Sequence, residues 1–402
     1  LTDRSDIGPL QGSVDLVISL NGQYEEVLAS AVQAPLGEDV NEEDLAGLFY
    51  TGGTTGASKG VMLTHRNLIA NAFNWLSAVP QSPNDRSLVM APMFHAAGSN
   101  GILAAIWQGS CQVALNTFDP KTVLQLIEKH KINITLGVPS MLAAIAEEQH
   151  VNPKDVSSLK ILAHGGSPIA TEVIKRCSQA FTSAQMVEVY GATETSPLAT
   201  LLGNEEQLID DPKARSCGRS VIGCSITICA PEGHTLPTGE VGEVVVSGAN
   251  IMKGYWNKAE QSAAVLKGGG YWTGDLGYLN AEGYLFLVDR SKDMIVSGGE
   301  NVYSTEVEDI LYKFPGVLEA AVFGVPDEKW GEAVYAVVVP RPEASDVTPE
   351  ALIAFCREHI GGYKVPKGID IQLEPLPKSG PGKVLKRELR APFWAATDRS
   401  VN

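Results

Sequence analysis

Residues 159–191 read LKILAHGGSPIATEVIKRCSQAFTSAQMVEVYG. An apolar run, Leu159–Ala163, leads into Gly165-Gly166 and predicts a buried strand, and Met186–Tyr190 predicts another. Between them, five apolar residues fall on one face of a helix: Ala170, Val173, Ile174, Cys177 and Phe181. A strand–helix–strand unit with short Gly turns is typical of a parallel α/β sheet.

The same alternation continues toward the N-terminus. Strands are expected at Ser87–Phe94, Gln112–Leu115 and Ile132–Val138, and helices at Gly101–Trp107, from Asp119-Pro120 onward, and at Ser140–Glu148. We therefore expect a parallel sheet covered by helices on both faces. Because ligands of such sheets bind at the carboxyl ends of the strands, the turns at Gly165-Gly166 and Tyr190-Gly191 are candidate ligand positions.

After Pro212 the pattern changes to short β-rich runs between Gly/Pro turns. The runs Ser225–Cys229, Gly242–Ser247 and Tyr284–Val288 predict an antiparallel sheet or a small barrel. A charge cluster, Asp289-Arg290-Ser291-Lys292-Asp293, follows the last of them. We place the domain boundary there, with a large domain at 1–290 and a small α+β domain at 291–402.

Four elements are expected in the small domain. They are a helix at Thr305–Phe314, strands at Val317–Val325 and Ala333–Pro340, and a helix at Glu350–His359. Thr305 and Glu308 have the spacing of a capping box, in which the two side chains satisfy backbone N–H groups at a helix start.

The composition limits the classes of function. The chain has 402 residues, an ordinary 44% of apolar residues, and a net charge of 31 − 47 = −16. The length predicts more than one domain, and the acidic balance argues against broad binding of nucleic acid or anionic membranes. No run is long and apolar enough for a transmembrane segment and no signal peptide is visible. Six scattered cysteines fit reduced thiols in a cytoplasmic enzyme.

The stretch Leu48–Gly60, LFYTGGTTGASKG, combines hydroxyls, glycines and a lysine. Its amides, hydroxyls and Lys59 could wrap a polyphosphate, although an ordinary mobile turn has a similar composition. It is not a Walker A loop, because no Gly-Lys-Ser/Thr follows.

This loop resembles the phosphate loop of the adenylate-forming (AMP-binding) superfamily, which includes acyl-CoA synthetases, peptide-synthetase adenylation domains and beetle luciferases. Five further segments match in order: Tyr190-Gly191-Ala192-Thr193-Glu194, Gly254-Tyr255-Trp256, Tyr271-Trp272-Thr273-Gly274-Asp275, Asp289–Asp293, and Pro377-Lys378-Ser379-Gly380-Pro381-Gly382-Lys383. Members usually carry a longer segment before this loop than residues 1–47, so we expect the N-terminal part of the large domain to be lacking.

The resemblance implies an ATP site. The loop residues Thr51, Gly52, Gly53, Thr54, Thr55, Gly56 and Lys59 would bind ATP, with Thr51 and Thr55 holding oxygens of the β- and γ-phosphates. Tyr190 and Gly191 would contact adenine, with Gly165, Gly166 and Ser167 as the opposite wall. Thr193 would contact the α-phosphate, and Glu194 would bind Mg²⁺. Asp275, assisted by Arg290, would accept the ribose hydroxyls. Taken singly, Glu194 and Asp275 would be read as ordinary loop residues.

The resemblance also implies a catalytic lysine and a moving domain. Lys383 would bridge the substrate carboxylate and the α-phosphate, with Thr193 and Glu194 as the other catalytic residues. Pro381 departs from the Ser or Thr common in the family and would stiffen the loop. Lys292 would be the hinge, and Gly298 and Gly299 would line the CoA passage. By themselves both lysines would be read as surface charges.

The acyl pocket is the least specified part. His95 would lie at its mouth, where a structural histidine is the alternative, and the pocket would be bordered by Ala96, Ala97, Gly98, His164 and Gly165. His164 departs from the small residue frequent at its position, so acyl specificity does not transfer.

The implied activity is an ATP-dependent acyl-CoA synthetase that forms acyl-AMP and then acyl-CoA, with Mg²⁺, ATP and CoA. The carboxylic acid is expected to be a medium- or long-chain fatty acid, with an aryl acid such as a cinnamate as the second choice. A ligase for a carrier-protein thiol, an enzyme that oxidises its adenylate, and a silent nucleotide-binding protein are the alternatives. The oligomeric state stays open, with a homodimer as one option.

Overall fold

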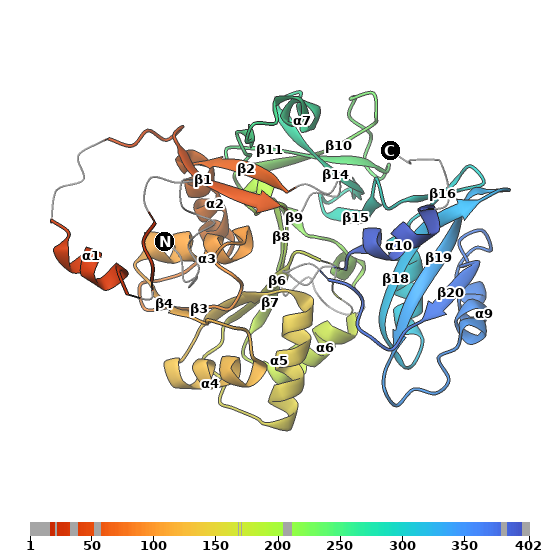
Figure 1. Cartoon of the computed structure of the whole chain (residues 1–402), viewed down its shortest axis with the longest axis horizontal. Coiled ribbons are helices and arrows are strands. Elements are labelled where there is room, and N and C mark those ends of the chain that lie inside the picture. Colours follow the sequence, from red (N-terminus) through yellow and green to blue (C-terminus); the bar gives the residue numbers. More distant parts are fainter. Residues whose placement is uncertain are drawn as a thin grey trace. The chain divides into compact units, whose positions relative to one another are not determined.

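The computed structural model describes residues 17–20, 22–32, 39–51, 58–167, 169, 171–203, 211–378 and 384–395. The chain divides into two compact units, residues 1–41 and residues 42–402. Within the first unit, α1 (Tyr24–Ser30) is the described helix. The second unit contains the described helices and strands from Leu45 onward (Figure 1).

A seven-stranded sheet forms the centre of the large domain. Five strands are parallel, in the order β4 (Cys111–Ala114), β3 (Arg86–Val89), β5 (Ile134–Gly137), β6 (Ile161–Gly165) and β7 (Gln185–Tyr190). Two antiparallel strands, β8 (Thr200–Leu202) and β9 (Arg219–Ser220), extend the β7 edge. The strand–helix alternation of the sequence is thus confirmed as a mainly parallel sheet.

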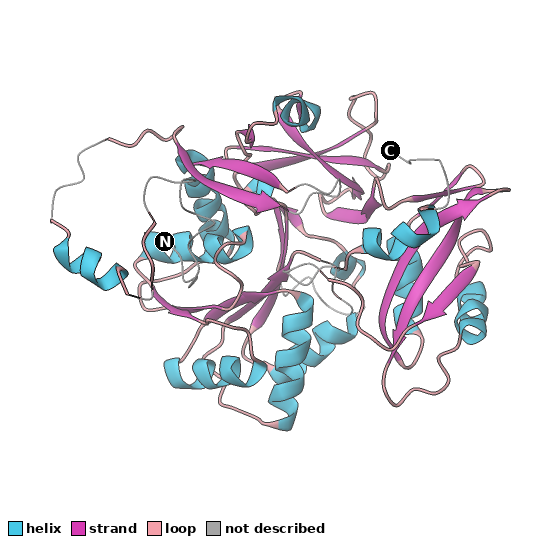
Figure 2. Cartoon of the chain, viewed as in Figure 1, coloured by secondary structure: helices cyan, strands magenta, loops and turns pink. Residues whose placement is uncertain are grey.

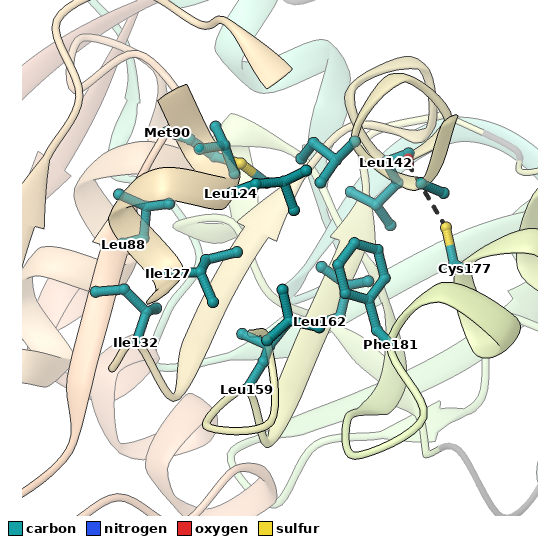
Figure 3. Close-up of a cluster of buried hydrophobic side chains, with 14 of the residues drawn as sticks. Leu88, Met90, Leu124, Ile127, Ile132, Leu142, Leu159, Leu162, Cys177 and Phe181 are labelled. Atoms are coloured by element: carbon teal, nitrogen blue, oxygen red, sulfur yellow. Dashed lines mark hydrogen bonds between the residues drawn. The ribbon is translucent and has the colours of Figure 1, made fainter. Parts of the chain in front are cut away.

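Helices cover both faces of this sheet (Figures 1 and 2). α4 (Pro120–His130), α5 (Pro139–Val151) and α6 (Thr171–Ala180) enclose one core, and α2 (His65–Ala78) and α3 (Ala96–Gln108) enclose the other. Consecutive strand residues alternate between them, because Leu162 enters the first core and Ala163 the second. Figure 3 shows the first core, where the Cys177 thiol also donates to the backbone carbonyl of Leu142.

Two predicted boundaries near residue 90 were wrong. The strand expected at Ser87–Phe94 ends at Val89, and the helix expected from Gly101 begins at Ala96. Between them the chain turns, with His95 N–H donating to the carbonyl of Pro92. A Cβ on Gly98 would lie 2.3 Å from the Pro92 carbonyl oxygen, so this glycine allows the helix to start against the turn.

Two antiparallel sheets complete the large domain. One contains β1 (Leu45–Thr51), β2 (Lys59–Thr64) and β12 (Gly254–Tyr255). The other contains β10 (Cys224–Cys229), β11 (Gly242–Gly248), β13 (Leu266–Lys267), β14 (Gly270–Leu279) and β15 (Leu285–Arg290), with α7 (Ala259–Val265) beside it. The antiparallel sheet predicted after Pro212 is confirmed. Short 3-10 turns lie at Thr193–Thr195 and Pro212–Arg215.

The C-terminal part is a second α+β assembly. Its sheet contains β16 (Ile295–Ser297), β17 (Glu300–Val302), β18 (Val317–Asp327), β19 (Gly331–Pro340) and β20 (Gly368–Ile371). α8 (Ser304–Lys313), α9 (Pro349–His359) and α10 (Lys386–Trp394) pack on it. The separate core agrees with a small α+β domain, while the boundary at 290/291 stays a prediction.

The capping box predicted at Thr305 and Glu308 was wrong. The Thr305 hydroxyl donates to the carbonyl of Val288, and the Glu308 carboxylate accepts from the N–H of Val322. The start of α8 is instead satisfied by Asp289, whose carboxylate accepts from the N–H and hydroxyl of Ser304. Tertiary partners have replaced the local ones that the spacing suggested.

Among the described helices, none is both long and apolar enough to cross a membrane.

Candidate active site

Three predicted nucleotide-binding side chains meet at the carboxyl end of β7. The Tyr190 hydroxyl donates to Asp275 Oδ2 at 2.8 Å, and Arg290 Nε lies 2.9 Å from Asp275 Oδ1. Asp275 and Arg290 are direct partners across β14 and β15. Side chains from three distant motifs therefore form one cluster at the edge of the sheet where ligands of α/β proteins bind.

The Asp275 carboxylate is fixed in orientation yet keeps acceptor capacity. Each carboxylate oxygen has about two lone-pair sites, and the contacts from Tyr190 and Arg290 use one on each oxygen. A vicinal diol such as a ribose could donate to the others. Burial raises the pKa of Tyr190, and the Asp275 charge and hydrogen bond add to this rise, so the phenol stays protonated.

A second chain of contacts links Glu194 to the phosphate-loop hairpin. The buried Glu194 carboxylate accepts from the Tyr255 hydroxyl at 2.8 Å through Oε1. The Lys59 ammonium lies 4.8 Å from the centroid of the Tyr255 ring, a cation–π contact. Burial raises the pKa of Tyr255, and the neighbouring Glu194 charge raises it further.

The ends of the predicted phosphate loop are fixed as a hairpin. Thr51 on β1 pairs with Lys59 on β2, and the Gly60 carbonyl accepts from the N–H of Trp256 at 2.7 Å. The turn residues Gly52, Gly53, Thr54, Thr55 and Gly56 lie outside the described residues. The geometry thus brings the two ends of the loop beside Tyr255, one side chain away from Glu194.

The glycines predicted to face the nucleotide have close neighbours of their own. A Cβ on Gly165 would lie 2.3 Å from the Val189 carbonyl oxygen, and one on Gly191 would lie 1.8 Å from that of Pro197. Gly166 has a φ of +81°, which favours glycine. Packing therefore already requires small residues here, and Ser167 and Thr193 lie half-buried in the same two turns.

Lys383 lies outside the described residues, but both sides of its segment are described. Lys378 and Val384 form an antiparallel bridge, and the N–H of Leu385 donates to the carbonyl of Pro377 at 2.8 Å. Lys378 forms an ion pair with Glu319. The two ends of segment 379–383 are therefore held together on the small domain.

A buried network anchors the residue that opens α10. Lys386 Nζ lies 2.7 Å from Glu308 Oε1 and donates to the Ser304 hydroxyl at 2.7 Å. Burial by itself lowers the pKa of Lys386, but the Glu308 carboxylate outweighs it and the pKa is raised. Since Ser304 also donates to Asp289, the network joins the charge cluster that begins at the end of β15 to the helix that follows Lys383.

The predicted hinge and CoA passage occupy two turns. Lys292 is exposed in the turn between β15 and β16. Gly298 and Gly299 form the two-residue connection of β16 and β17, with φ of +63° and +87°, as a type I′ hairpin requires. A Cβ on Gly298 would also lie 2.6 Å from the Trp330 ring. Their proposed roles in catalysis stay predictions.

The predicted acyl-pocket residues differ in exposure. His95 is half-buried at the start of α3, and burial lowers its pKa. Ala96 is buried, and the side chain of Ala97 lies outside the described part. His164 is fully buried, and burial lowers its pKa to about 4, which keeps the imidazole neutral at physiological pH.

Sequence reasoning missed a clamp of asparagines behind the Glu194 turn. Asn71 Oδ1 accepts from the N–H of Leu198 at 3.0 Å, and Asn250 Nδ2 donates to the carbonyls of Thr195 and Leu198. Asn67 Nδ2 donates to the carbonyls beside Asn250, those of Ala249 and Ile251. The available signal was Asn67, Asn71 and Asn74 at i, i+4 and i+7, polar residues on one buried helical face.

Known proteins identify the fold that carries this cluster. Residues 6–256 match the family described as "AMP-binding enzyme", and residues 306–383 match the "AMP-binding enzyme C-terminal domain". The chain belongs to the AMP-binding enzyme family. A feruloyl-CoA synthase of an Amycolatopsis species is 40% identical over 367 residues, which are 91% of this chain and 73% of that protein. A long-chain-fatty-acid–CoA ligase of Bacillus subtilis is 38% identical over 353 residues, 87% of this chain and 62% of that protein.

Solved structures of adenylate-forming enzymes show the same fold as this chain. ATP-bound MatB from Rhodopseudomonas palustris matches with a TM-score of 0.85 at 30% identity, over 92% of this chain and 72% of that chain. The predicted family, the fold class with a large and a small domain, and the acid–thiol ligase class are thereby confirmed, as is membership of a family that uses ATP. The chain matched here spans 73% and 62% of the lengths of these two relatives.

Proposed function

We propose that this AMP-binding enzyme is an AMP-forming acyl-CoA ligase that works in two steps. A carboxylate oxygen of the acid attacks the α-phosphorus of ATP, and pyrophosphate leaves. The CoA thiol then attacks the acyl carbonyl, and AMP leaves with the oxygen that the acid supplied. The observation that carries the proposal is the convergence of Tyr190, Asp275 and Arg290 beside the Glu194–Tyr255–Lys59 chain.

The first cluster is proposed to hold the nucleoside. Asp275 would accept the two ribose hydroxyls, because Tyr190 and Arg290 hold its carboxylate still. The Tyr190 ring would offer an apolar surface to adenine, with Gly165, Gly166 and Ser167 as the opposite wall. Thr51, Lys59 and Thr193, with the loop 52–57, would surround the phosphates.

Magnesium fits the donor set at Glu194. Mg²⁺ is usually bound through one or two carboxylates together with substrate phosphates and water. Glu194 is a buried carboxylate oriented by Tyr255, and the described residues contain no group of three or more His, Cys, Asp or Glu side chains that could hold a metal ion by themselves. The ion would neutralise phosphate charge, and Tyr255 would keep the carboxylate turned toward it.

Lys383 is proposed as the catalytic cation, bridging the carboxylate and the α-phosphate while negative charge builds up on the phosphorus oxygens. The contacts at Lys378 and Lys386 would fix both ends of its segment. Lys292 would be the hinge about which the small domain rotates between the adenylation state and the thioester-forming state. Gly298-Gly299 would line the path of the CoA thiol.

Two acid classes are candidates. A medium- or long-chain fatty acid is the first expectation from the sequence, and a relative at 38% identity is named for that activity. An aryl acid is the second, and a relative at 40% identity is named a feruloyl-CoA synthase. Two buried polar atoms without partners among the described residues, on Trp75 and Gln81, favour the aryl class.

The assay is acid-dependent release of pyrophosphate from ATP and Mg²⁺, followed by AMP release on addition of CoA. Lys383→Ala should abolish the first step, whereas Lys367→Ala, a change at an exposed lysine of the same domain, should leave it intact. Unchanged adenylation by Lys383→Ala would refute the assignment. Transfer to a carrier-protein thiol but not to CoA would favour that alternative, and ATP binding without pyrophosphate release would favour a silent binding protein.

A further inference from the structure

A cavity of about 40 Å³ lies between α3 and the strands β3 and β5. Its walls are mostly apolar and include Met90, Gly98, Gly101 and Leu136. A cavity needs only about 10–15 Å³ to hold one water molecule, so this one has room for a small chemical group.

Two buried polar atoms belong to side chains that line this cavity. They are the indole nitrogen Nε1 of Trp75 and the amide oxygen Oε1 of Gln81. Within the described part of the chain neither atom has a hydrogen-bond partner, and Trp75 is only 3% exposed. Because unsatisfied buried polar atoms are rare and costly, the two atoms indicate a binding partner that supplies hydrogen-bonding capacity and is otherwise apolar.

The chemistry of the two atoms specifies that partner. An indole N–H can only donate, and an amide oxygen can only accept. A hydroxyl group does both, since its oxygen accepts from Trp75 while its hydrogen is donated to Gln81. A terminal methyl group would leave both atoms unsatisfied.

The cavity leads away from the predicted acyl-binding edge. At one end it is lined by Ala91 and Gly98, which lie on either side of His95 in the sequence, in the turn between β3 and α3 and in the first turn of that helix. It reaches Ser87 near the start of that strand, four residues or about 13 Å away. Gln81 lies in the segment just before β3 and so belongs to this far end.

Helix α3 leaves open space at Gly101, which lines the cavity, because no atom lies within 4 Å of the position that a Cβ of Gly101 would occupy. Gly98 lines the cavity one turn earlier, with its own Cβ position filled by the Pro92 carbonyl. A planar ring could lie against the helix at Gly101.

We propose that this cavity receives the distal end of the acid, and that Trp75 and Gln81 bind a hydroxyl group there, so that the substrate is a hydroxyaryl carboxylic acid. The inference rests on the proposed acid-activating function and names its substrate class. Trp75 and Gln81 are specificity-determining residues that act at the end of the acid remote from its carboxylate.

The test compares acids that differ by one hydroxyl. Pyrophosphate release is measured with 4-hydroxycinnamate, cinnamate, decanoate and 10-hydroxydecanoate, and binding of the two cinnamates is measured by calorimetry without nucleotide. We expect kcat/KM to favour 4-hydroxycinnamate over cinnamate by at least about 100-fold, because a site built for a hydroxyl discriminates strongly against its absence.

Three variants separate recognition from packing. Trp75→Phe and Gln81→Met each introduce an apolar side chain that cannot form the hydrogen bond. Each should reduce the hydroxyl preference about tenfold or more, because the larger loss of kcat/KM falls on 4-hydroxycinnamate. Trp107→Phe, at an exposed tryptophan of α3, should leave the preference intact. Equal losses on both cinnamates would show a structural role and overturn the inference.

The remaining outcomes distinguish this inference from the proposed function. Pyrophosphate release with equal kcat/KM for the two cinnamates, or with preference for either decanoate, would overturn the inference and leave the function standing. Tighter binding of 4-hydroxycinnamate without pyrophosphate release from any acid would support the inference and overturn the function.

Discussion

The Lys386–Glu308 pair should be among the most costly polar contacts of the small domain to break. The side chains of Lys386 and Glu308 are only 17% and 15% exposed, and their charged atoms lie 2.7 Å apart. Replacing one partner of a buried pair leaves the other charge uncompensated, at a cost of about 3–5 kcal/mol. Because Val322 still donates to Glu308 in Lys386→Met, we expect a loss near the lower end, about 3 kcal/mol.

The Lys131–Asp155 ion pair is a matched control, because its N–O distance is the same as that of the Lys386–Glu308 pair. Lys131 and Asp155 also lie 2.7 Å apart, but their side chains are 59% and 48% exposed. Breaking that exposed pair with Lys131→Met should cost less than about 1 kcal/mol, because water screens it. The comparison isolates burial, since the distance between the charges is the same.

The assay is native-state hydrogen exchange of the backbone amides in α8 and α10, which reports the local free energy of opening. The double variant Lys386→Met/Glu308→Gln should recover most of the protection, because it removes both charges together. Loss of less than about 1 kcal/mol in Lys386→Met, or a double variant as unprotected as the single one, would refute the reasoning.

Three other perturbations have defined outcomes. Burial raises the pKa of Glu188 from 4.5 to about 7, so between these pH values the unfolded chain loses a proton that the folded chain keeps, and stability falls as pH rises. The unfolding free energy of Glu188→Gln, measured with urea, should therefore rise relative to that of the wild type by up to about 3 kcal/mol as the pH goes from 4.5 to 7. A difference between the two proteins that does not depend on pH would contradict the raised pKa. Gly191→Ala should lower the unfolding free energy by about 1–3 kcal/mol, because its Cβ would overlap the Pro197 carbonyl, while Gly203→Ala, with open space around it, should not; equal melting temperatures would argue against the clash. Tyr255→Phe removes the hydrogen bond to the proposed magnesium ligand and should weaken ATP-dependent adenylation about tenfold, which titration of Mg²⁺ in the pyrophosphate assay checks; an unchanged Mg²⁺ dependence would count against that role.

The motifs of the sequence named several residues that the structure brings together, because each motif is a short, local pattern at or near a strand. Tyr190 closes β7 and Asp275 lies on β14, so the resemblance could name both, and the structure brings them within hydrogen-bond distance. The alternation of apolar runs likewise predicted the parallel sheet, because strand and helix periods are local properties.

Contacts between residues far apart in the chain could not be predicted from local sequence patterns. Lys386 and Glu308 are 78 residues apart, and nothing local marks either as buried. The capping box at Thr305 was a valid local pattern, but Val288 and Val322 provided tertiary partners that replaced it. The asparagine clamp was visible only as polar residues on a helical face, whose partners lie in other segments.

The central claim, that the acid is activated as an adenylate, is tested most directly with an acid labelled with oxygen-18 in its carboxylate. In the proposed mechanism a carboxylate oxygen forms the new bond to the α-phosphorus and remains on AMP when CoA attacks the acyl carbonyl. Mass spectrometry should then find one labelled oxygen in AMP and none in pyrophosphate. Unlabelled AMP, or label in orthophosphate formed together with ADP, would contradict the account.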